Sequence, residues 1–437
     1  MTAGEDMLLA GARNLLRYAR VVLLVVSGAA TLTPPVCAQT YHIIHTFTQQ
    51  ASYPMDGLVA DAAGNLYGST SAGGNTYNGT IFRMTLRDSA WMYTTIYNFQ
   101  GGSDGSEPLS TPVFGPDGAL YGMTYAGGAN PNCPSVCGTV YRLVPPPTVC
   151  KTTLCEWSDQ VIYSFGSNTP DGYNPYSRVS FDSNGNLYGS TSQGGNLPPP
   201  DQNFGAIFQL THSNGVWSEN ILLTFIGMGN GNNPTWGVIV DNSGNVYGTS
   251  PSADICGTEH YTCGAVFELQ QPNWRYSFIY TFDHSDDGTA PYGAPVWDAE
   301  GNMYGSTAAG SLDGSSGATI WKLSPSNGSW VRTTLYSWPV GAWGGKGSLT
   351  MDAHGNLYGI QAPIYGSGAG SVFKLTNNNG VWSYSTLHEF NGSDGSYPNG
   401  SLVVDANGNV FGTTWMGGHP PTGQCYDGCG VVFEITR

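Results

Sequence analysis

The sequence predicts an all-β protein, a single seven-bladed β-propeller built from four-stranded antiparallel blades. One short phrase, typified by residues 64–68 (Gly-Asn-Leu-Tyr-Gly), recurs along the 437 residues, and no helical periodicity follows the N-terminal region. The first glycines of the copies are Gly64, Gly118, Gly185, Gly244, Gly301, Gly355 and Gly408. A fixed period of about 57 residues indicates one supersecondary unit stacked repeatedly. Four-stranded units arranged radially form a propeller.

Each repeat reads as four short strands bounded by Gly, Asn, Asp and Pro. The first strand is apolar and ends at an aspartate, as in residues 237–241, and after a tight turn the second strand carries the recurring phrase. A glycine-rich loop leads to the third strand, as in residues 205–210. The fourth strand begins with tryptophan and ends eight residues later with an aromatic residue. The pairs are Trp91/Phe99, Trp157/Phe165, Trp217/Phe225, Trp274/Phe282, Trp330/Trp338 and Trp382/Phe390.

The two ends of the chain are predicted to share one blade. The sequence stops after a third strand, residues 430–435, whereas a strand with the character of a fourth strand stands at residues 41–47. The N-terminal strand is therefore expected to complete the last blade and to close the ring. A pair of β-sandwiches is the rival all-β fold, but it does not explain why the missing strand stands at the opposite terminus.

Residues 1–38 are predicted to be a signal peptide, and residues 39–437 the propeller domain. Three arginines in residues 13–20 precede an apolar run at 21–26 and a small-residue cleavage pattern ending before Gln39. Gln39 stands eight residues before Phe47, where other fourth strands begin with tryptophan. Lipidation of Cys37 is a less favoured alternative, because the preceding Pro-Pro-Val is a poor lipobox. We expect a secreted or periplasmic protein with no transmembrane anchor after cleavage, and a monomer.

Composition narrows the classes of partner. A formal net charge of −16 and an isoelectric point near 4.6 argue against nucleic acid and anionic membranes. Without Cys37, eight cysteines remain, and an even number in an exported chain indicates disulfides. The predicted pairs are Cys133/Cys137, Cys150/Cys155, Cys256/Cys263 and Cys425/Cys429. Zinc is less favoured, because the pairs fall in different repeats without histidines at ligand spacing.

Comparing the repeats with one another separates scaffold from candidate site. The aspartates that end first strands are interpreted as turn residues whose carboxylates accept backbone N–H groups, and the recurring tyrosines and tryptophans as packing between blades. A proline lies seven residues before most of these aspartates, and the residues near it vary. The candidate ligand-binding residues, expected at the channel mouth on the long-loop face, are Tyr176, Arg178, Trp236, Tyr292 and Lys346. The alternative is that these side chains only plug the channel.

The recurring phrases resemble the bacterial GloVer (Gloeo/Verruco) tandem repeat, with its Asn-Leu-Tyr-Gly-Thr-Thr, Gly-Gly and Gly-Thr-Val-Phe elements. The corresponding residues are 65–70 with 73–74 and 79–82, 186–191 with 194–195, and 409–414 with 417–418. The resemblance covers essentially the whole chain after the signal region. It implies an exported propeller-like protein and supplies no catalytic residues.

Two functional hypotheses follow, and a scaffold for protein assembly is a third interpretation. The first is a non-catalytic module that binds an extracellular glycan, a cell-wall component or a protein. The second is a propeller hydrolase or lyase acting on a polysaccharide, which would need two opposed carboxylates or a metal near the channel mouth. The residues available for such chemistry are Asp56, Glu107, His284 and His419. No cofactor or metal is expected; calcium is left open, although no run of alternating oxygen ligands is present.

Overall fold

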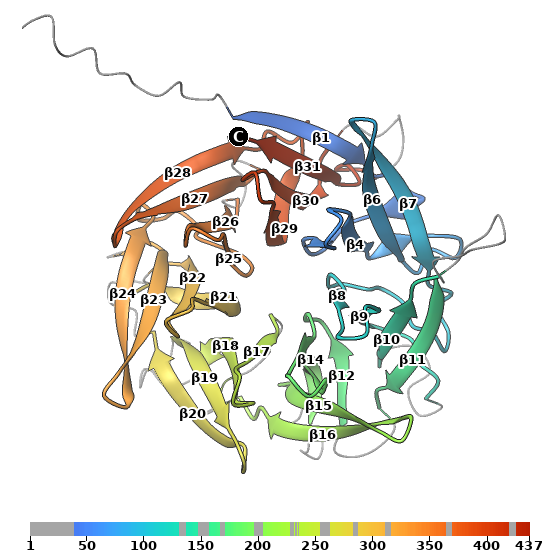
Figure 1. Ribbon diagram of the computed structural model, residues 1–437, viewed down its shortest axis with the longest axis horizontal. Helices are drawn as coiled ribbons and strands as arrows, with labels where there is room; N and C mark the ends of the chain where they lie inside the picture. Colours follow the sequence, from blue (N-terminus) through green and yellow to red (C-terminus); the bar gives the residue numbers. More distant parts are fainter. Residues whose placement is uncertain are drawn as a thin grey trace, which may run out of the picture. The chain divides into compact units, whose positions relative to one another are not determined.

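In the computed structural model the chain folds as a seven-bladed β-propeller (Figure 1). The structure describes residues 39–130, 137–146, 157–166, 171–195, 204–227, 231, 234, 236–253, 263–282, 287–310, 316–363, 369–418 and 425–437. None of these residues is helical, and so none forms a helix that could span a membrane. The expected signal peptide, residues 1–38, lies outside the described residues.

Seven antiparallel sheets form the blades, each with its first strand innermost and its fourth strand at the rim. Blade 1 contains β3 (Val59–Ala60), β4 (Leu66–Thr70), β6 (Thr80–Arg87) and β7 (Ala90–Asn98), beside a small ribbon of β2 (Ala51–Ser52) and β5 (Ala72–Gly73). Blade 2 contains β8 (Val113–Phe114), β9 (Leu120–Thr124), β10 (Thr139–Val144) and β11 (Ser158–Ser164). In blade 3 the inner strand is divided into β12 (Asp171–Pro175) and β13 (Ser180–Phe181), followed by β14 (Leu187–Gly195), β15 (Ala206–Ser213) and β16 (Val216–Thr224).

The second half of the ring repeats this order. Blade 4 contains β17 (Val238–Val240), β18 (Val246–Ala253), β19 (Cys263–Gln270) and β20 (Arg275–Thr281). Blade 5 contains β21 (Thr289–Trp297), β22 (Met303–Ala309), β23 (Thr319–Ser326) and β24 (Ser329–Ser337). Blade 6 contains β25 (Thr350–Met351), β26 (Leu357–Gln361), β27 (Ser371–Asn378) and β28 (Val381–Glu389).

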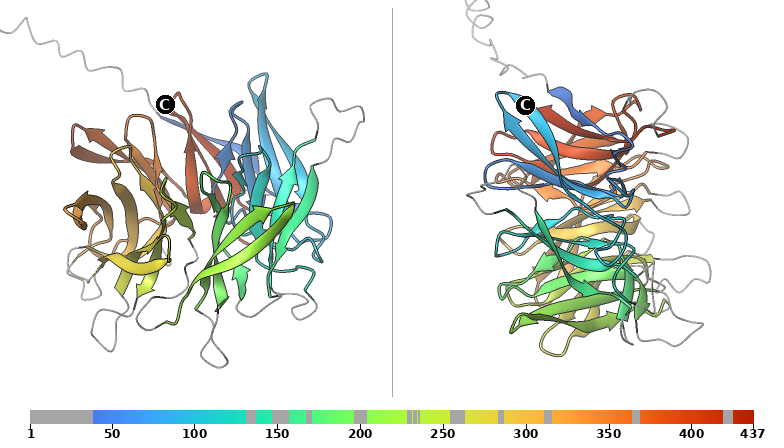
Figure 2. Two further views of the ribbon diagram at one scale, coloured as in Figure 1. Left: turned by 60° about the horizontal axis from the view of Figure 1, so that its bottom comes forward. Right: turned by 90° about the vertical axis from the view of Figure 1, so that its right-hand side faces the viewer.

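Blade 7 joins the two ends of the propeller, as the sequence predicts. It contains β29 (Ser396–Val404), β30 (Val410–Met416), β31 (Val431–Thr436) and, from the start of the domain, β1 (Thr40–Thr46). Strand β1 pairs antiparallel with β31, from Thr40 opposite Thr436 to Thr46 opposite Val431. Figure 2 shows these two strands, blue and red, side by side in both views. The N-terminal strand therefore covers an edge of β31 that would otherwise be unpaired.

The apolar core lies in seven layers, one between each pair of consecutive blades. Each layer joins inner-strand residues of one blade to the Leu-Tyr-Gly phrase and third strand of its neighbour. The recurring tyrosines and tryptophans meet edge-on or tilted across these layers, as in Tyr67–Trp157 and Tyr304–Trp382, whose ring centroids lie 6.0 and 6.1 Å apart. The prediction that these aromatic residues serve interblade packing is confirmed.

The aspartates at the ends of the first strands are turn residues. Asp61 Oδ1 accepts the backbone N–H groups of Ala63 and Asn65, both at 2.9 Å, and Oδ2 accepts the Asn65 side chain at 2.7 Å and the Tyr67 hydroxyl at 3.0 Å. Burial raises the pKa of the Asp61 carboxyl, but these hydrogen bonds outweigh burial and leave the pKa below its usual value. The same arrangement returns at Asp182, Asp241, Asp298 and Asp352. These carboxylates are thus fully used by the scaffold.

The predicted disulfides are described only in part. Cys425 and Cys429 form a disulfide, as predicted, and Cys137 is also disulfide-bonded. Cys133, Cys150, Cys155 and Cys256 lie outside the described residues, as does the side chain of Cys263. The remaining pairings stay predictions.

Candidate functional site

The variable residues near the channel are positioned by a contact that recurs between blades. In this proline–glycine contact, the proline in or just before an inner strand packs over the glycine at the start of the third strand of the preceding blade. A Cβ built on Gly79 would lie 2.5 Å from Pro108 Cδ, and one on Gly138 would lie 2.6 Å from Pro175 Cδ. Only glycine fits so close to the ring, and both glycines also have positive φ. The other pairs are Gly205/Pro234, Gly264/Pro291, Gly370/Pro398 and Gly430/Pro54.

The contact between blades 5 and 6 departs from this pattern. Ala318 takes the place of the glycine, as shown by its carbonyl, which accepts the N–H of Trp338 in the way that Gly79 accepts that of Phe99. Gly345 takes the place of the proline, and a Cβ on the preceding Gly344 would lie 2.4 Å from Ala318 Cβ. Ala318 therefore adds a methyl group where the other blades have glycine, and Gly344 and Gly345 leave room for it because neither carries a side chain. Lys346 directly follows Gly345 in this contact between blades 5 and 6.

The structure divides the five candidate residues between two cavities. Tyr176, Arg178 and Trp236 line a cavity of about 20 Å³ on the channel axis, together with Met55, Asp56, Leu109, Ser177, Gly347, Ser348, Gly400 and Ser401. That volume holds about one water molecule. Tyr292 and Lys346 line a separate cavity of about 720 Å³, which is within the range usual for small-molecule sites. The Trp236 and Tyr292 rings meet edge-on, with centroids 5.2 Å apart, and so separate the two cavities.

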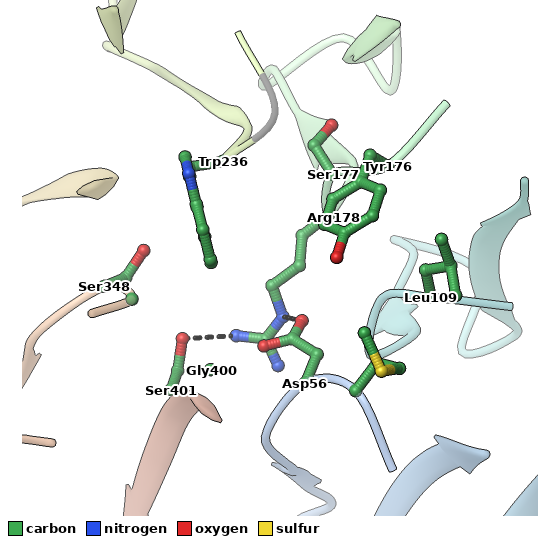
Figure 3. Close-up of a pocket in the computed structure, with 11 residues that line it drawn as sticks. Asp56, Leu109, Tyr176, Ser177, Arg178, Trp236, Ser348, Gly400 and Ser401 are labelled. Carbon is green, nitrogen blue, oxygen red and sulfur yellow. Dashed lines mark hydrogen bonds and ion pairs between the residues drawn. The ribbon is translucent and has the colours of Figure 1, made fainter. Parts of the chain in front are cut away.

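Arg178 crosses the channel from blade 3 (Figure 3). Its Nη1 donates to Ser401 Oγ at 3.0 Å, its Nη2 to the Leu58 carbonyl at 3.1 Å, and its Nε lies 3.3 Å from Asp56 Oδ2. Asp56 in turn accepts the backbone N–H of Thr111 at 2.9 Å. The guanidinium thus links blade 3 to the inner strands of blades 1 and 7. The carboxylate that pairs with the guanidinium is thus supplied by this chain, within the channel.

The larger cavity lies where blades 5, 6 and 7 meet on the long-loop face. Its lining residues come from β21 and the start of β29, from the ends of β22 and β30, and from the connections that follow β24, β26, β28 and β30: Tyr292, Ala308, Trp343, Lys346, Ala362, Pro363, Gly392, Ser396, Tyr397, Trp415, Met416 and Asp427. Four aromatic side chains are among them, and each is half-buried or exposed. Tyr397 and Trp415 meet edge-on at 5.9 Å and form one wall.

Small residues in two blades create the space. Ala308 of blade 5 and Ala362 of blade 6 lie at or just after the end of the second strand, at the position that Trp415 occupies in blade 7 and Tyr125 in blade 2. A side chain the size of tryptophan at either alanine would occupy the cavity. The sequence comparison did not select Trp343, Tyr397, Trp415 or Asp427. Aligning the seven repeats at the third residue after the second glycine of the recurring phrase, rather than only after the proline, would have singled out Trp415.

Backbone hydrogen bonds hold the segment that carries Trp343 and Lys346. The Gly344 N–H donates to the Ala308 carbonyl at 2.8 Å, the Lys346 N–H to Ile360 at 3.3 Å, and the Gln361 side chain to the Trp343 carbonyl at 2.9 Å. Burial lowers the pKa of the Lys346 ammonium. No carboxylate of the described residues lies within 4 Å of that ammonium. Lys346 is therefore a cation without a counter-ion in the described part of the chain.

Of the four residues named for the enzymatic hypothesis, the structure describes Asp56 and Glu107. Asp56 is paired with Arg178, whereas Glu107 is exposed in the connection between blades 1 and 2. His284 and His419 lie outside the described residues. Among the described residues, no group of three His, Cys, Asp or Glu side chains could hold a metal ion. Asp427 is the one carboxylate among the described residues that line the larger cavity.

Comparison with known proteins supports the fold and the repeat. A family model described as Gloeobacter/Verrucomicrobia repeat matches residues 30–258 and 255–437. No curated protein sequence matches the chain. One similar structure is a candidate 6-phosphogluconolactonase from Bacteroides uniformis, with a TM-score of 0.51 and 14% identity over 82% of this chain and 89% of that one. Another is the extracellular domain of a candidate hybrid two-component system from B. thetaiotaomicron, with a TM-score of 0.54 and 10% identity over 90% of this chain and 39% of that one. At these identities the likeness shows the fold alone.

Proposed function

The chain belongs to the Gloeobacter/Verrucomicrobia repeat family, and from that premise we propose that it is an exported, non-catalytic module that binds a glycan through the cavity between blades 5, 6 and 7. Cell-wall components fall within this class, and a protein ligand is the alternative occupant. The observation that carries the proposal is the aromatic lining of the cavity, since Tyr292, Trp343, Tyr397 and Trp415 surround about 720 Å³.

Aromatic faces suit sugar rings, because the C–H groups of a pyranose pack against a π surface while the hydroxyl groups remain hydrated. Polar atoms that could orient a sugar are also present, on Ser396 and Lys346. The rings stand on strands and on hydrogen-bonded connections, so little conformational entropy is lost on binding.

The number of carboxylates in the described lining favours binding without catalysis. Glycoside hydrolysis generally uses two carboxyl groups about 5–10 Å apart. The described lining offers Asp427 alone, and Asp427 is exposed at the rim. Export is supported by the Cys425–Cys429 disulfide, because disulfides persist in oxidising compartments.

A glycan-array screen followed by titration calorimetry tests the proposal. Trp415→Ala should weaken binding by about 1–3 kcal/mol, because it removes one wall of the cavity, and should leave the melting temperature nearly unchanged. Trp217→Ala is the matched control. Trp217 packs against Tyr121 between blades 2 and 3, far from the cavity, and its loss should cost roughly 2–3 kcal/mol of stability without changing binding at a temperature where the variant is folded. Normal binding by the Trp415 variant would refute the site.

The axial residues provide a second comparison. Trp236→Ala opens the 20 Å³ cavity but removes only an edge contact to Tyr292. If the ligand lies in the larger cavity, this variant should bind more tightly than Trp415→Ala. The reverse order would favour a ligand at the smaller cavity, which Tyr176 and Trp236 line.

A further inference from the structure

We propose that the cavity between blades 5, 6 and 7 selects an acidic sugar, with the carboxylate of a hexuronic acid residue received by the Lys346 ammonium. This inference rests on the proposed function and adds the chemical class of the ligand. It is carried by the position of one cation, by the absence of a partner for it among the described residues, and by the composition of the surrounding walls.

Cations are scarce in this chain, and those of the channel region are used differently. The sequence has 14 lysines and arginines against 30 acidic residues. Arg178 is already paired with Asp56 inside the channel. Lys346, in contrast, lines an open cavity, and no carboxylate of the described residues is within ion-pair distance. A half-buried ammonium without a counter-ion is a costly arrangement unless a ligand supplies the anion.

The repeat shows that this cation is not required by the scaffold. The residues that follow the corresponding prolines in other blades include Met55, Leu109, Tyr176, Tyr292 and Asn399, and none of these carries a charge. Lysine appears only at the junction where alanine and glycine replace the proline–glycine contact. The segment is nevertheless held by the hydrogen bonds of Gly344 and Lys346 to Ala308 and Ile360. The backbone that carries the Lys346 side chain is thus held in place, which is a condition for selective recognition.

The walls of the cavity fit a sugar better than a simple anion. A phosphate or sulfate site would need several convergent N–H donors or cations, whereas the described lining offers one cation and four aromatic rings. Asp427 stands exposed at the rim, where water screens its charge. A sugar with one carboxylate can place its ring against Tyr397 and Trp415 and its anion on Lys346. The cation would repel a quaternary ammonium ligand, which aromatic cages otherwise attract.

The net charge of −16 opposes the approach of long polyanions. At physiological ionic strength this opposition is screened beyond about 8 Å, so that the local contact decides the affinity for a short oligosaccharide. A hydrogen bond to a charged partner contributes about 1.5–3 kcal/mol, which corresponds to a factor of about 10–100 in affinity.

The test uses the full mature protein and three matched probes: tetragalacturonic acid, its fully methyl-esterified form and a neutral galactose tetrasaccharide. The acid should bind about 10–100 times more tightly than its ester in titration calorimetry. Lys346→Met keeps the length of the side chain and removes the charge, so it should abolish that preference while retaining affinity for the ester. Lys322→Met is the control, because Lys322 lies on β23 over the Tyr304 ring and outside the cavity.

The outcomes separate the two proposals. Equal binding of acid and ester by the wild-type protein, lowered for both by Trp415→Ala, would overturn the acidic-sugar inference and leave glycan binding in place. A preference for the acid that survives in Lys346→Met would also overturn it. Binding of none of the three probes, together with an empty glycan array, would overturn both. Thermal melts of each variant distinguish lost binding from lost folding.

Discussion

Raising the pH should weaken the contact between blades 1 and 2, because two carboxyl groups face each other there. Asp159 on β11 lies close to Asp104 of the connection between the blades, and the Tyr97 hydroxyl donates to Asp104 Oδ2 at 2.9 Å. Tyr141 is the other titratable group near Asp159. Burial, and then the Asp104 charge, raise the pKa of the Asp159 carboxyl from 3.8 to about 7.

The sign of the effect follows from the direction of the shift. A carboxyl whose pKa is higher in the folded state binds its proton more tightly there, so its contribution is fully present below the unfolded pKa and is lost as the pH rises towards 7. A shift of about three units corresponds to about 4 kcal/mol. Asp159 is only half-buried, and solvent screening reduces the expected contribution to about 1–2 kcal/mol.

Chemical denaturation of the wild-type protein and Asp159→Asn at pH 5 and pH 8.5 measures this contribution. Asparagine imitates the neutral carboxyl, and at pH 5 part of the contribution is already lost, so the variant should gain up to about 1 kcal/mol relative to wild type between the two pH values. Asp182→Asn is the control, because Asp182 is a turn acceptor on another blade. A wild-type–variant difference that is the same at both pH values would refute the reasoning.

Three further predictions concern the scaffold. Deleting residues 41–47 removes β1 and the buried Phe47, so the last blade should lose its edge partner and the protein should aggregate or melt far earlier; wild-type stability would contradict closure through β1. Gly138→Ala should lower the free energy of unfolding by about 2–4 kcal/mol, because the new Cβ would clash with Pro175 and with the backbone, at a residue with positive φ. Urea titration measures this loss. Gly215→Ala is the control, because Gly215 also has positive φ but its Cβ would meet no neighbour within 4 Å. Mass spectrometry of the exported protein should show a mature N-terminus at Gln39 or its cyclised form and no free thiol, and a lipid on Cys37 would contradict the predicted localisation.

The repeated positions could be predicted from the sequence because each copy meets the same surroundings. An aspartate seven residues after a proline, or a tryptophan eight residues before an aromatic, occupies an equivalent turn or interblade layer in nearly every blade. Seven copies therefore act as an internal alignment, from which the blade number, the strand order and the closure by residues 41–47 follow. Such features depend on local turns and on nearest neighbours.

The residues of the candidate site could be predicted only in part, because the site is formed by contacts between residues of different blades. The sequence comparison selected Tyr292 and Lys346, which do line the larger cavity, but it grouped them with Arg178, whose side chain reaches Asp56 and Ser401 instead. Nothing local specifies whether a long side chain at the channel mouth turns towards the axis or towards a neighbouring blade. Four aromatic side chains and a lysine from three blades surround the larger cavity because ring closure sets the distances between those blades. These distances follow only from the tertiary structure.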